Sequence, residues 1–377
     1  MKTRTYFGML WALCVLAIWG EEAQAQFMNT ISIHGFGGWA YGKTDNENQY
    51  LVGNEDGSYD TVNFSLNITA TPYERLSIYV QPDYNEGGFE EEGVGLDYAF
   101  AEWYFSDKLL LRAGKVKAPF LLFTEVYDVG TIRPFFALPQ AIYQQMAAEA
   151  YKGVGLTGSL FPKEGWELQY DLYGGKLSLQ PNPVINTQTF EFISVTPEAN
   201  DLVGGRLSLQ TPLTGFNIAM SAFTANFELS NLGPSLNDRY VLMGPSLEYW
   251  SDRWRIRSEY VTQASSSKVS FDSVYVEAAY QVTEHWQMAA RYEYANFETT
   301  APPETQALPS SVYEHQETAL GLNYWFNPNL VFKLSYHIVE GNRFAFPDDI
   351  QTYLQRIQTG GFDETTHLVL IGTQFSF

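Results

Sequence analysis

Residue types that could perform catalysis are sparse in this chain of 377 residues. Its single cysteine, Cys14, lies in an apolar N-terminal stretch, so the rest of the chain can form no disulfide, thiolate metal site or cysteine nucleophile. Neither a GxSxG motif nor a glycine-rich phosphate loop is present. The histidines, none of them at the spacing of metal ligands, are His34, His285, His315, His337 and His367. The sequence predicts no enzyme, no cofactor and no metal site, and leaves open only a Ser–His pair formed across strands.

The overall charge excludes one class of partner. The chain has 22 Lys and Arg against 43 Asp and Glu, a formal net charge of −21, which disfavours binding to nucleic acid. Charged residues make up 17% of the chain and aromatic residues 16%, whereas an average soluble domain carries roughly 25% charged residues. Much aromatic surface must therefore face something other than water.

One group of charged residues could act on a passing solute. Arg133 is the single cation of segment 118–150, which also carries Glu125, Asp128 and Glu149. We predict that Arg133 and the cations before the segment form one side of a narrow passage and face Glu125 and Asp128. Opposite charges across a narrow water-filled passage order water and favour polar solutes over apolar ones. The predicted constriction residues are Arg112, Lys115, Lys117, Glu125, Asp128 and Arg133.

A second set of cations is defined by strand geometry. Side chains alternate between the two faces of a strand, so residues two apart share a face. Five cations share the polar face of their strands with carboxylates such as Glu259 and Glu293. Because this face carries charges of both signs, the side chains could serve only to make a water-filled lumen polar, or they could select anions; the sequence is equally consistent with both. The predicted wall residues are Arg206, Arg255, Arg257, Arg291 and Lys333.

The elements that must position these residues are β-strands. Apolar and polar residues alternate with period two from residue 31 onward, for example across 62–69. Counting such stretches gives about sixteen strands of roughly ten residues each, the length that a tilted membrane strand needs. Short turns alternate with long polar connections, as in outer-membrane barrels. The turns are expected at 71–73, 106–108, 162–165, 211–215, 251–252, 283–284 and 327–329.

The fold class that follows is all-β: a transmembrane antiparallel up-and-down β-barrel over residues 26–377. Aromatic residues near the turns would form the girdle at one membrane interface, and a soluble sandwich core is the alternative explanation for them. Strand parity predicts that one set of leucines faces lipid, and that the polar residues beside them face the lumen and tolerate charge. The two sets are Leu66, Leu168, Leu322 and Leu334, and Asn67, Gln169 and Asn323.

Residues 1–25 have the pattern of a secretory signal peptide. Lys2 and Arg4 precede the apolar stretch 9–19, and the triplet 23–25 is a small-residue cleavage site. A lipoprotein anchor at Cys14 is disfavoured because the apolar stretch continues past it. No later stretch approaches the roughly 20 apolar residues of a membrane helix, so any membrane-spanning part must consist of strands.

Segment 118–150 interrupts the strand pattern, and it is too apolar for a solvated loop. Loops of this length inside compact folds are usually functional. We expect it to be the third external loop and to fold into the barrel, where it narrows the lumen. Packing outside the barrel, on a neighbouring subunit, is the alternative.

Two regions resemble a known family. Residues 111–135, with the motifs LRAGK, PF, DVG and RPF, resemble the third strand-pair region of phosphate-selective porins of the O and P type, and the hairpin 324–337, with YWFNPNLV, resembles their penultimate hairpin. The resemblance implies a sixteen-stranded, usually trimeric, water-filled barrel whose third external loop forms the constriction. The chain departs from the family in one respect, since phosphate-selective members line the constriction with arginines and lysines.

The function expected from this resemblance involves no covalent chemistry. Small hydrophilic solutes or ions, phosphate and other anions among them, would diffuse passively across the outer membrane of a Gram-negative-type bacterium. The expected partners are outer-membrane lipid, lipopolysaccharide and further copies of the chain in a homotrimer, and divalent cations would bridge acidic loops to lipopolysaccharide phosphates. The alternative is a barrel without transport, acting as an adhesin or a surface-binding protein.

Overall fold

A computed structural model describes residues 30–86, 93–146, 148–179, 182–186, 191–195, 198–229, 236–265, 269–299, 309–347 and 349–377. The predicted signal peptide, residues 1–25, lies outside this part of the chain, and so do the acidic residues 90–92.

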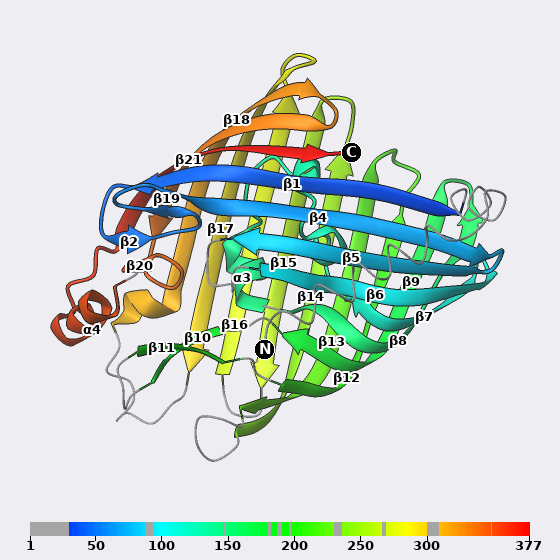
Figure 1. The fold of residues 1–377 in the computed structure, drawn as a ribbon, viewed down its shortest axis with the longest axis horizontal. Coiled ribbons are helices and arrows are strands. Elements are labelled where there is room, and N and C mark those ends of the chain that lie inside the picture. The colour runs from blue at the N-terminus through cyan, green and yellow to red at the C-terminus, as the bar shows by residue number, and fades with distance from the viewer. Residues whose placement is uncertain are drawn as a thin grey trace, which may run out of the picture.

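The described strands form one closed barrel (Figure 1). β1 (Ile31–Thr44) pairs with β4 on one side and with β21 on the other, and β9 pairs with β12, so the sheet closes on itself. Of its seventeen described strands, β3 (Gly53–Asn54) has only two residues, and the other sixteen confirm the predicted antiparallel barrel. Those after β1 are β4 (Ser58–Tyr73), β5 (Leu76–Glu86), β6 (Gly93–Ser106), β7 (Leu109–Lys117), β8 (Ala148–Lys163), β9 (Trp166–Leu179), β12 (Glu198–Gln210), β13 (Phe216–Leu229), β14 (Leu236–Trp250), β15 (Trp254–Ser265), β16 (Val269–Gln281), β17 (Trp286–Thr299), β18 (Glu314–Asn327), β19 (Leu330–Glu340) and β21 (Thr365–Ser376).

Short turns join the strands at one end of the barrel, close to the predicted positions. Asp107 and Lys108 connect β6 to β7, for example. One turn differs from the prediction, because β4 continues through 71–73 and the turn lies at 74–75. Pro72 lacks a backbone N–H, and it disturbs the strand pairing, which shifts register between Ala70 and Tyr73, without ending the strand.

The outer face of the barrel is apolar and the inner face is polar. In β18, Leu320 and Leu322 are 57% and 38% exposed, whereas Glu317 and Asn323 are fully buried inside. Such an arrangement, with large apolar side chains on the outside, is that of a barrel surrounded by lipid. Trp254 and Trp286 are exposed beside the short turns, at the place predicted for an aromatic girdle, whereas Trp250 pairs with Arg255 on the inner face of the barrel.

The longer connections carry the remaining elements at the other end of the barrel (Figure 1). The first contains β2 (Asn48–Gln49), which pairs with β20 (Phe346–Pro347) of the last, and the last also contains α4 (Ile350–Thr359). Arg356 of α4 binds Glu47 at 2.7 Å, so part of the acidic surface predicted for the loops holds two loops together. The others are the hairpin β10 (Asn182–Asn186) and β11 (Glu191–Val195), and η5 (Ser310–Tyr313). Among the described residues, no helix is long and apolar enough to cross a membrane.

Candidate functional site

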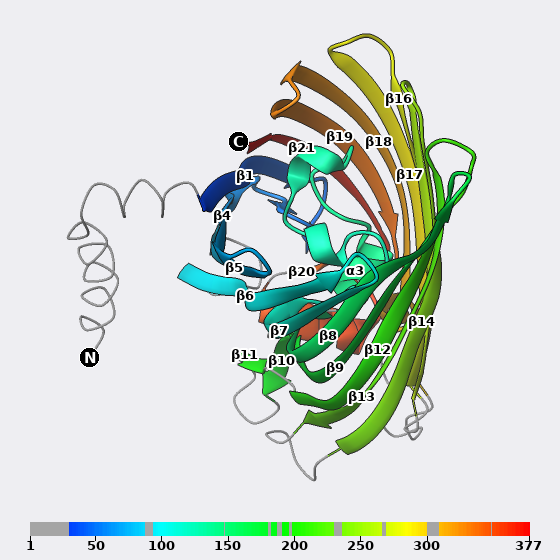
Figure 2. The same ribbon diagram turned by 90° about the vertical axis from the view of Figure 1, so that its right-hand side faces the viewer.

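The third connection, between β7 and β8, lies inside the barrel. It contains η2 (Thr124–Val126), η3 (Gly130–Ile132) and α3 (Gln140–Met146), and Figure 2 shows α3 enclosed by the strands. Its apolar side chains are buried, with Phe120 and Phe135 each 1% exposed. We call residues 118–147 the inserted loop.

Small residues on the inner face of the wall make room for this loop. Phe135 packs in a cluster with Ala279, Ala289 and Ala319, which lie on three successive strands. At Gly372 of β21, an added Cβ would lie 2.8 Å from Cδ2 of Phe136, so a side chain there would displace the loop. The wall is therefore shaped to receive the loop.

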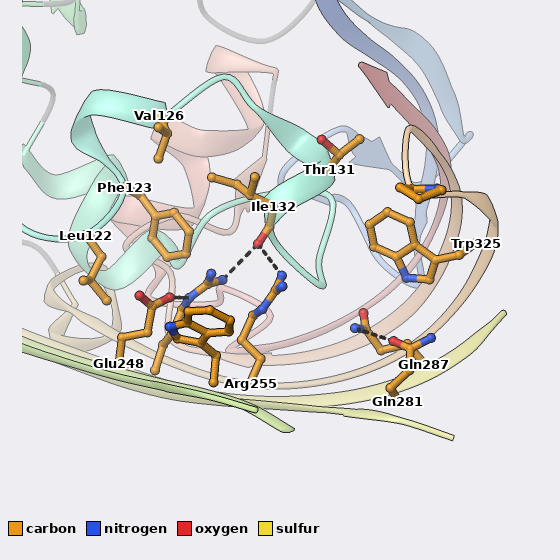
Figure 3. Close-up of a pocket in the computed structure, with 13 residues that line it drawn as sticks. Leu122, Phe123, Val126, Thr131, Ile132, Glu248, Arg255, Gln281, Gln287 and Trp325 are labelled. Atoms are coloured by element: carbon orange, nitrogen blue, oxygen red, sulfur yellow. Dashed lines mark hydrogen bonds and ion pairs between the residues drawn. The ribbon is translucent and has the colours of Figure 1, made fainter. Parts of the chain in front are cut away.

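Three of the predicted wall cations bind backbone carbonyls in the first half of the inserted loop. Arg206 Nη1 donates to the carbonyl oxygen of Leu121 at 3.1 Å. Arg255 and Arg257 both donate through Nη1 to the carbonyl oxygen of Ile132 at 3.1 Å, as Figure 3 shows.

The other two wall cations bind the second half in the same manner. Arg291 Nη1 donates to the carbonyl of Ala137 at 3.0 Å, and its guanidinium lies 4.7 Å from the ring centre of Phe135. Lys333 Nζ donates to the carbonyls of Gly130, Arg133 and Phe135 at 2.8, 2.7 and 3.1 Å. Because Lys333 is only 1% exposed, carbonyl dipoles replace the water that its ammonium would otherwise bind.

Three further side chains of the wall bind the inserted loop, two carboxylates as hydrogen-bond acceptors and one amide as a donor. Glu259 accepts the N–H of Leu122 at 2.7 Å and the hydroxyl of Tyr143 at 2.6 Å. Glu293 accepts the N–H of Ala141 at 2.8 Å, and Asn323 donates to the carbonyl of Pro134 at 2.8 Å. Sequence reasoning missed these roles, although strand parity had placed all three side chains on the inner face. We call strands β12 to β19 the anchoring wall.

The opposite side of the inserted loop contacts strands β5 to β7, which we call the facing wall. There the loop presents side-chain carboxylates. Arg112 binds Glu102 at 2.8 Å and Glu125 at 3.5 Å. The side chains of Arg112 and Glu125 are 24% and 29% exposed, so this pair is in contact with water.

Lys117 provides a second contact on the facing wall. Its ammonium lies 2.8 Å from Asp97, 3.2 Å from Asp128 and 2.9 Å from Glu149. Asp128 is 24% exposed, and its carboxylate also accepts the amide of Gln81 at 3.4 Å. The structure thus brings together Arg112, Lys117, Glu125 and Asp128 of the predicted constriction set.

The structure does not bring the other two members of that set into this group. Arg133 is buried within the loop, where it donates to the carbonyls of Phe136 and Tyr127 at 3.0 and 2.5 Å, and burial lowers its pKa to about 10. Lys115 donates to the carbonyl of Leu96, a residue exposed on the outer face, and strand register aligns Lys115 with the exposed Lys152. Lys115 thus binds a backbone carbonyl of β6, whereas Lys117 binds the three carboxylates.

A cavity of about 650 Å³ lies between the inserted loop and the anchoring wall. Figure 3 shows Phe123 and Ile132 of the loop on one side, with Glu248 and Arg255 of the wall on the other. Trp250 and Trp325 belong to its lining near the short turns. Charged, amide and aromatic groups thus meet in one polar vestibule.

The fold and this site define a class of protein. A closed barrel that is apolar outside and polar inside, with a segment anchored across its lumen, is an outer-membrane barrel of the porin type. The model of the family phosphate-selective porin O and P matches residues 221–377, which include the hairpin 324–337 and confirm the resemblance in that part. The inserted loop lies outside the matched region.

Solved structures show the same fold. An anion-selective porin from Comamonas acidovorans has a TM-score of 0.57 at 8% identity, over 92% of this chain and 99% of that one. The channel DcaP of Acinetobacter baumannii has a TM-score of 0.57 at 9% identity, over 92% and 97%. OmpT of Vibrio cholerae in its trimer form has a TM-score of 0.56 at 10% identity, over 92% and 99%. No curated protein matches the chain in sequence.

Proposed function

We propose that the protein is a porin through which small hydrophilic solutes and ions diffuse passively, along a water path between the inserted loop and the facing wall. The observation that supports this path is the exposure of opposite charges there. Arg112, Glu125 and Asp128 keep about a quarter of their side-chain surface accessible; on the anchoring wall Glu248 beside the cavity is 23% exposed, whereas Arg291 has no accessible side-chain surface. The proposed process contains no catalytic step.

The charges along this path favour hydrated solutes of either sign over apolar ones. Arg112 and Lys117 lie among five carboxylates, those of Asp97, Glu102, Glu125, Asp128 and Glu149, so carboxylates outnumber cations here. A transverse field of this kind aligns water and polar solutes. A dedicated phosphate path would need an excess of cations, because anion selection follows the sign of charge nearest the path. We therefore propose a general channel without phosphate specificity.

Two properties of the mature protein belong to the same proposal. We expect cleavage after residue 25, so that mass spectrometry of protein from the outer membrane gives a chain that starts at Gln26. We also expect a homotrimer, since porins of this architecture assemble in that way and OmpT of Vibrio cholerae has a trimer form. Cross-linking in detergent followed by gel electrophoresis without heating measures the number of subunits.

Planar-bilayer recording tests the channel. The purified protein should give ohmic steps, and deletion of residues 124–140 should raise single-channel conductance severalfold, because the segment occupies the lumen. A folded protein that gives no steps would instead support the alternative of an adhesin or surface-binding barrel. Unchanged conductance in the folded deletion variant would remove the inserted loop from the path.

A further inference from the structure

A cluster of buried polar groups on the inner face of the barrel lacks a central partner. Glu293 of β17 and Glu317 of β18 are direct cross-strand neighbours, and His315 lies two residues before Glu317 on the same face. All three side chains are 0% exposed. One ligand atom from each, an imidazole nitrogen and two carboxylate oxygens, lies within 4.8 Å of the other two.

The imidazole of His315 is the group that requires a partner. Neither of its ring nitrogens has a hydrogen-bond partner, and the ring is enclosed by Phe344 at 4.9 Å and Tyr50 at 6.0 Å between ring centres. A buried polar atom without a partner lowers the stability of the folded protein, so two such atoms on one ring indicate a missing ligand.

The carboxylates retain coordination capacity. Oε1 of Glu293 has no hydrogen bond and only an ion-pair contact of 3.4 Å with Arg291. Glu317 binds His337 at 2.8 Å and Arg291 at 3.3 Å, and it accepts the hydroxyl of Tyr50. A carboxylate offers about four acceptor positions, so a further contact remains available to each.

The acidic cluster on the facing wall shows how a satisfied site differs. Asp97, Asp128 and Glu149 also lie within 4.8 Å of one another, but the ammonium of Lys117 stands among them at 2.8 to 3.2 Å. That cluster carries its own cation. The cluster of Glu293, His315 and Glu317 also has a cation, because Arg291 lies 3.4 and 3.3 Å from its two carboxylates, but it differs in containing an unpartnered imidazole, which is a metal ligand when neutral.

We propose that Glu293, His315 and Glu317 form a binding site for one divalent transition-metal ion, with Zn²⁺ as the ion that best suits one nitrogen and two carboxylate ligands. An atom at the centre of the three ligand atoms would be about 2.8 Å from each, so ligand distances near 2.0–2.2 Å need only small side-chain movements. The ion would connect β17 and β18 beneath the inserted loop, because Glu293 also holds the N–H of Ala141.

Metal content after folding tests the site. Since the ligands are fully buried, the protein is folded from urea into detergent with and without Zn²⁺, passed through a chelating resin and analysed for metal. We expect one equivalent of Zn²⁺ per chain in the wild type. With Co²⁺ in place of Zn²⁺ we expect visible absorption bands of a site with nitrogen and oxygen ligands.

Two substitutions and a control decide the outcome. His315→Gln and Glu293→Gln should each lower the affinity for Zn²⁺ at least tenfold and abolish the Co²⁺ bands, whereas His367→Gln, on a half-buried histidine of β21 outside the cluster, should change neither. If His315→Gln does not fold, as judged by heat-dependent migration in gels, Glu293→Gln decides alone. Substoichiometric metal in the wild type, or unchanged binding in a folded ligand variant, would overturn the proposal and leave buried water as the partner of His315. None of these measurements depends on channel activity.

Discussion

The anchoring wall and the facing wall hold the same loop by different chemistry. On the anchoring wall, buried cations such as Lys333 and Arg291 bind backbone carbonyls of the loop. On the facing wall, Arg112 and Lys117 bind the side-chain carboxylates of Glu125 and Asp128; Arg112, Glu125 and Asp128 are each about a quarter exposed, whereas Lys117 is buried. Glu125 is shared between the walls, because Arg206 of the anchoring wall also binds it. The comparison teaches that charges on one polar face of a barrel can have separate functions, one structural and one directed at solutes.

The largest effect is expected at Lys333. Lys333→Met removes the donor of three carbonyls in a site without water, and we expect the free energy of unfolding to fall by about 3 kcal/mol or more. Urea titration in lipid vesicles, followed by tryptophan fluorescence, measures this change. Lys43→Met, on an exposed lysine of β1, is the control and should stay within about 0.5 kcal/mol of the wild type. An equal loss in both variants would contradict an anchoring role.

The next largest effect concerns the introduction of a charge on the inner face, at one position covered by the inserted loop and at one that is exposed. From sequence, Asn323 and Gln169 were both expected to accept a charge, but Asn323 is fully buried against Pro134 of the loop, while Gln169 is exposed. Asn323→Arg should therefore cost about 2 kcal/mol, because it buries an unpaired charge and removes a hydrogen bond. Gln169→Arg should be nearly neutral in the same titration, and similar costs at both positions would show that the loop does not seal Asn323 from water.

A smaller effect concerns ion selectivity. The double variant Glu125→Gln with Asp128→Asn should move the reversal potential in a salt gradient toward anions, and Arg112→Gln should move it toward cations, each by roughly a twofold change in permeability ratio. Lys115→Gln, three positions along the same strand, removes a cation whose ammonium binds the backbone carbonyl of Leu96, and it is the matched control. A shift at Lys115 as large as that at Arg112 would place the path elsewhere.

The smallest effect is expected at Arg133, which the sequence placed on one side of the constriction together with Arg112, Lys115 and Lys117. Its guanidinium binds carbonyls of its own loop and is buried. Arg133→Gln should therefore change the reversal potential less than Arg112→Gln does. It should increase current noise, because the loop loses the hydrogen bonds that Arg133 makes to its backbone. A shift in reversal potential larger than that of Arg112→Gln would show that Arg133 lies along the water path.

Sequence patterns predicted the barrel because its strands obey a local rule, the alternation of lipid-facing and lumen-facing side chains. The same rule placed the five wall cations on the inner face. Lys115 and Arg133 were not assigned by this rule but by sign of charge and proximity in sequence. Their partners, the carbonyls of Leu96 and Phe136, carry no side-chain signal.

The buried cluster shows a similar limit. His315 and Glu317 stand two apart on one strand, and this period-two spacing could have been noticed. Glu293 joins them only through the register between β17 and β18, which pairs it directly with Glu317. Register between two strands joined by a long connection is a property of the folded sheet and cannot be read from either strand alone.

The attachment of the loop through its backbone has an evolutionary consequence. Every residue type has a carbonyl, so Lys333, Arg255 and Arg257 would bind a loop of quite different sequence, provided its backbone followed the same course. Mutations in the loop's exposed side chains can therefore alter which solutes pass without loss of its attachment. For protein engineering, this barrel is a scaffold onto which loops from other channels can be grafted, with the wall kept constant and the passage redesigned.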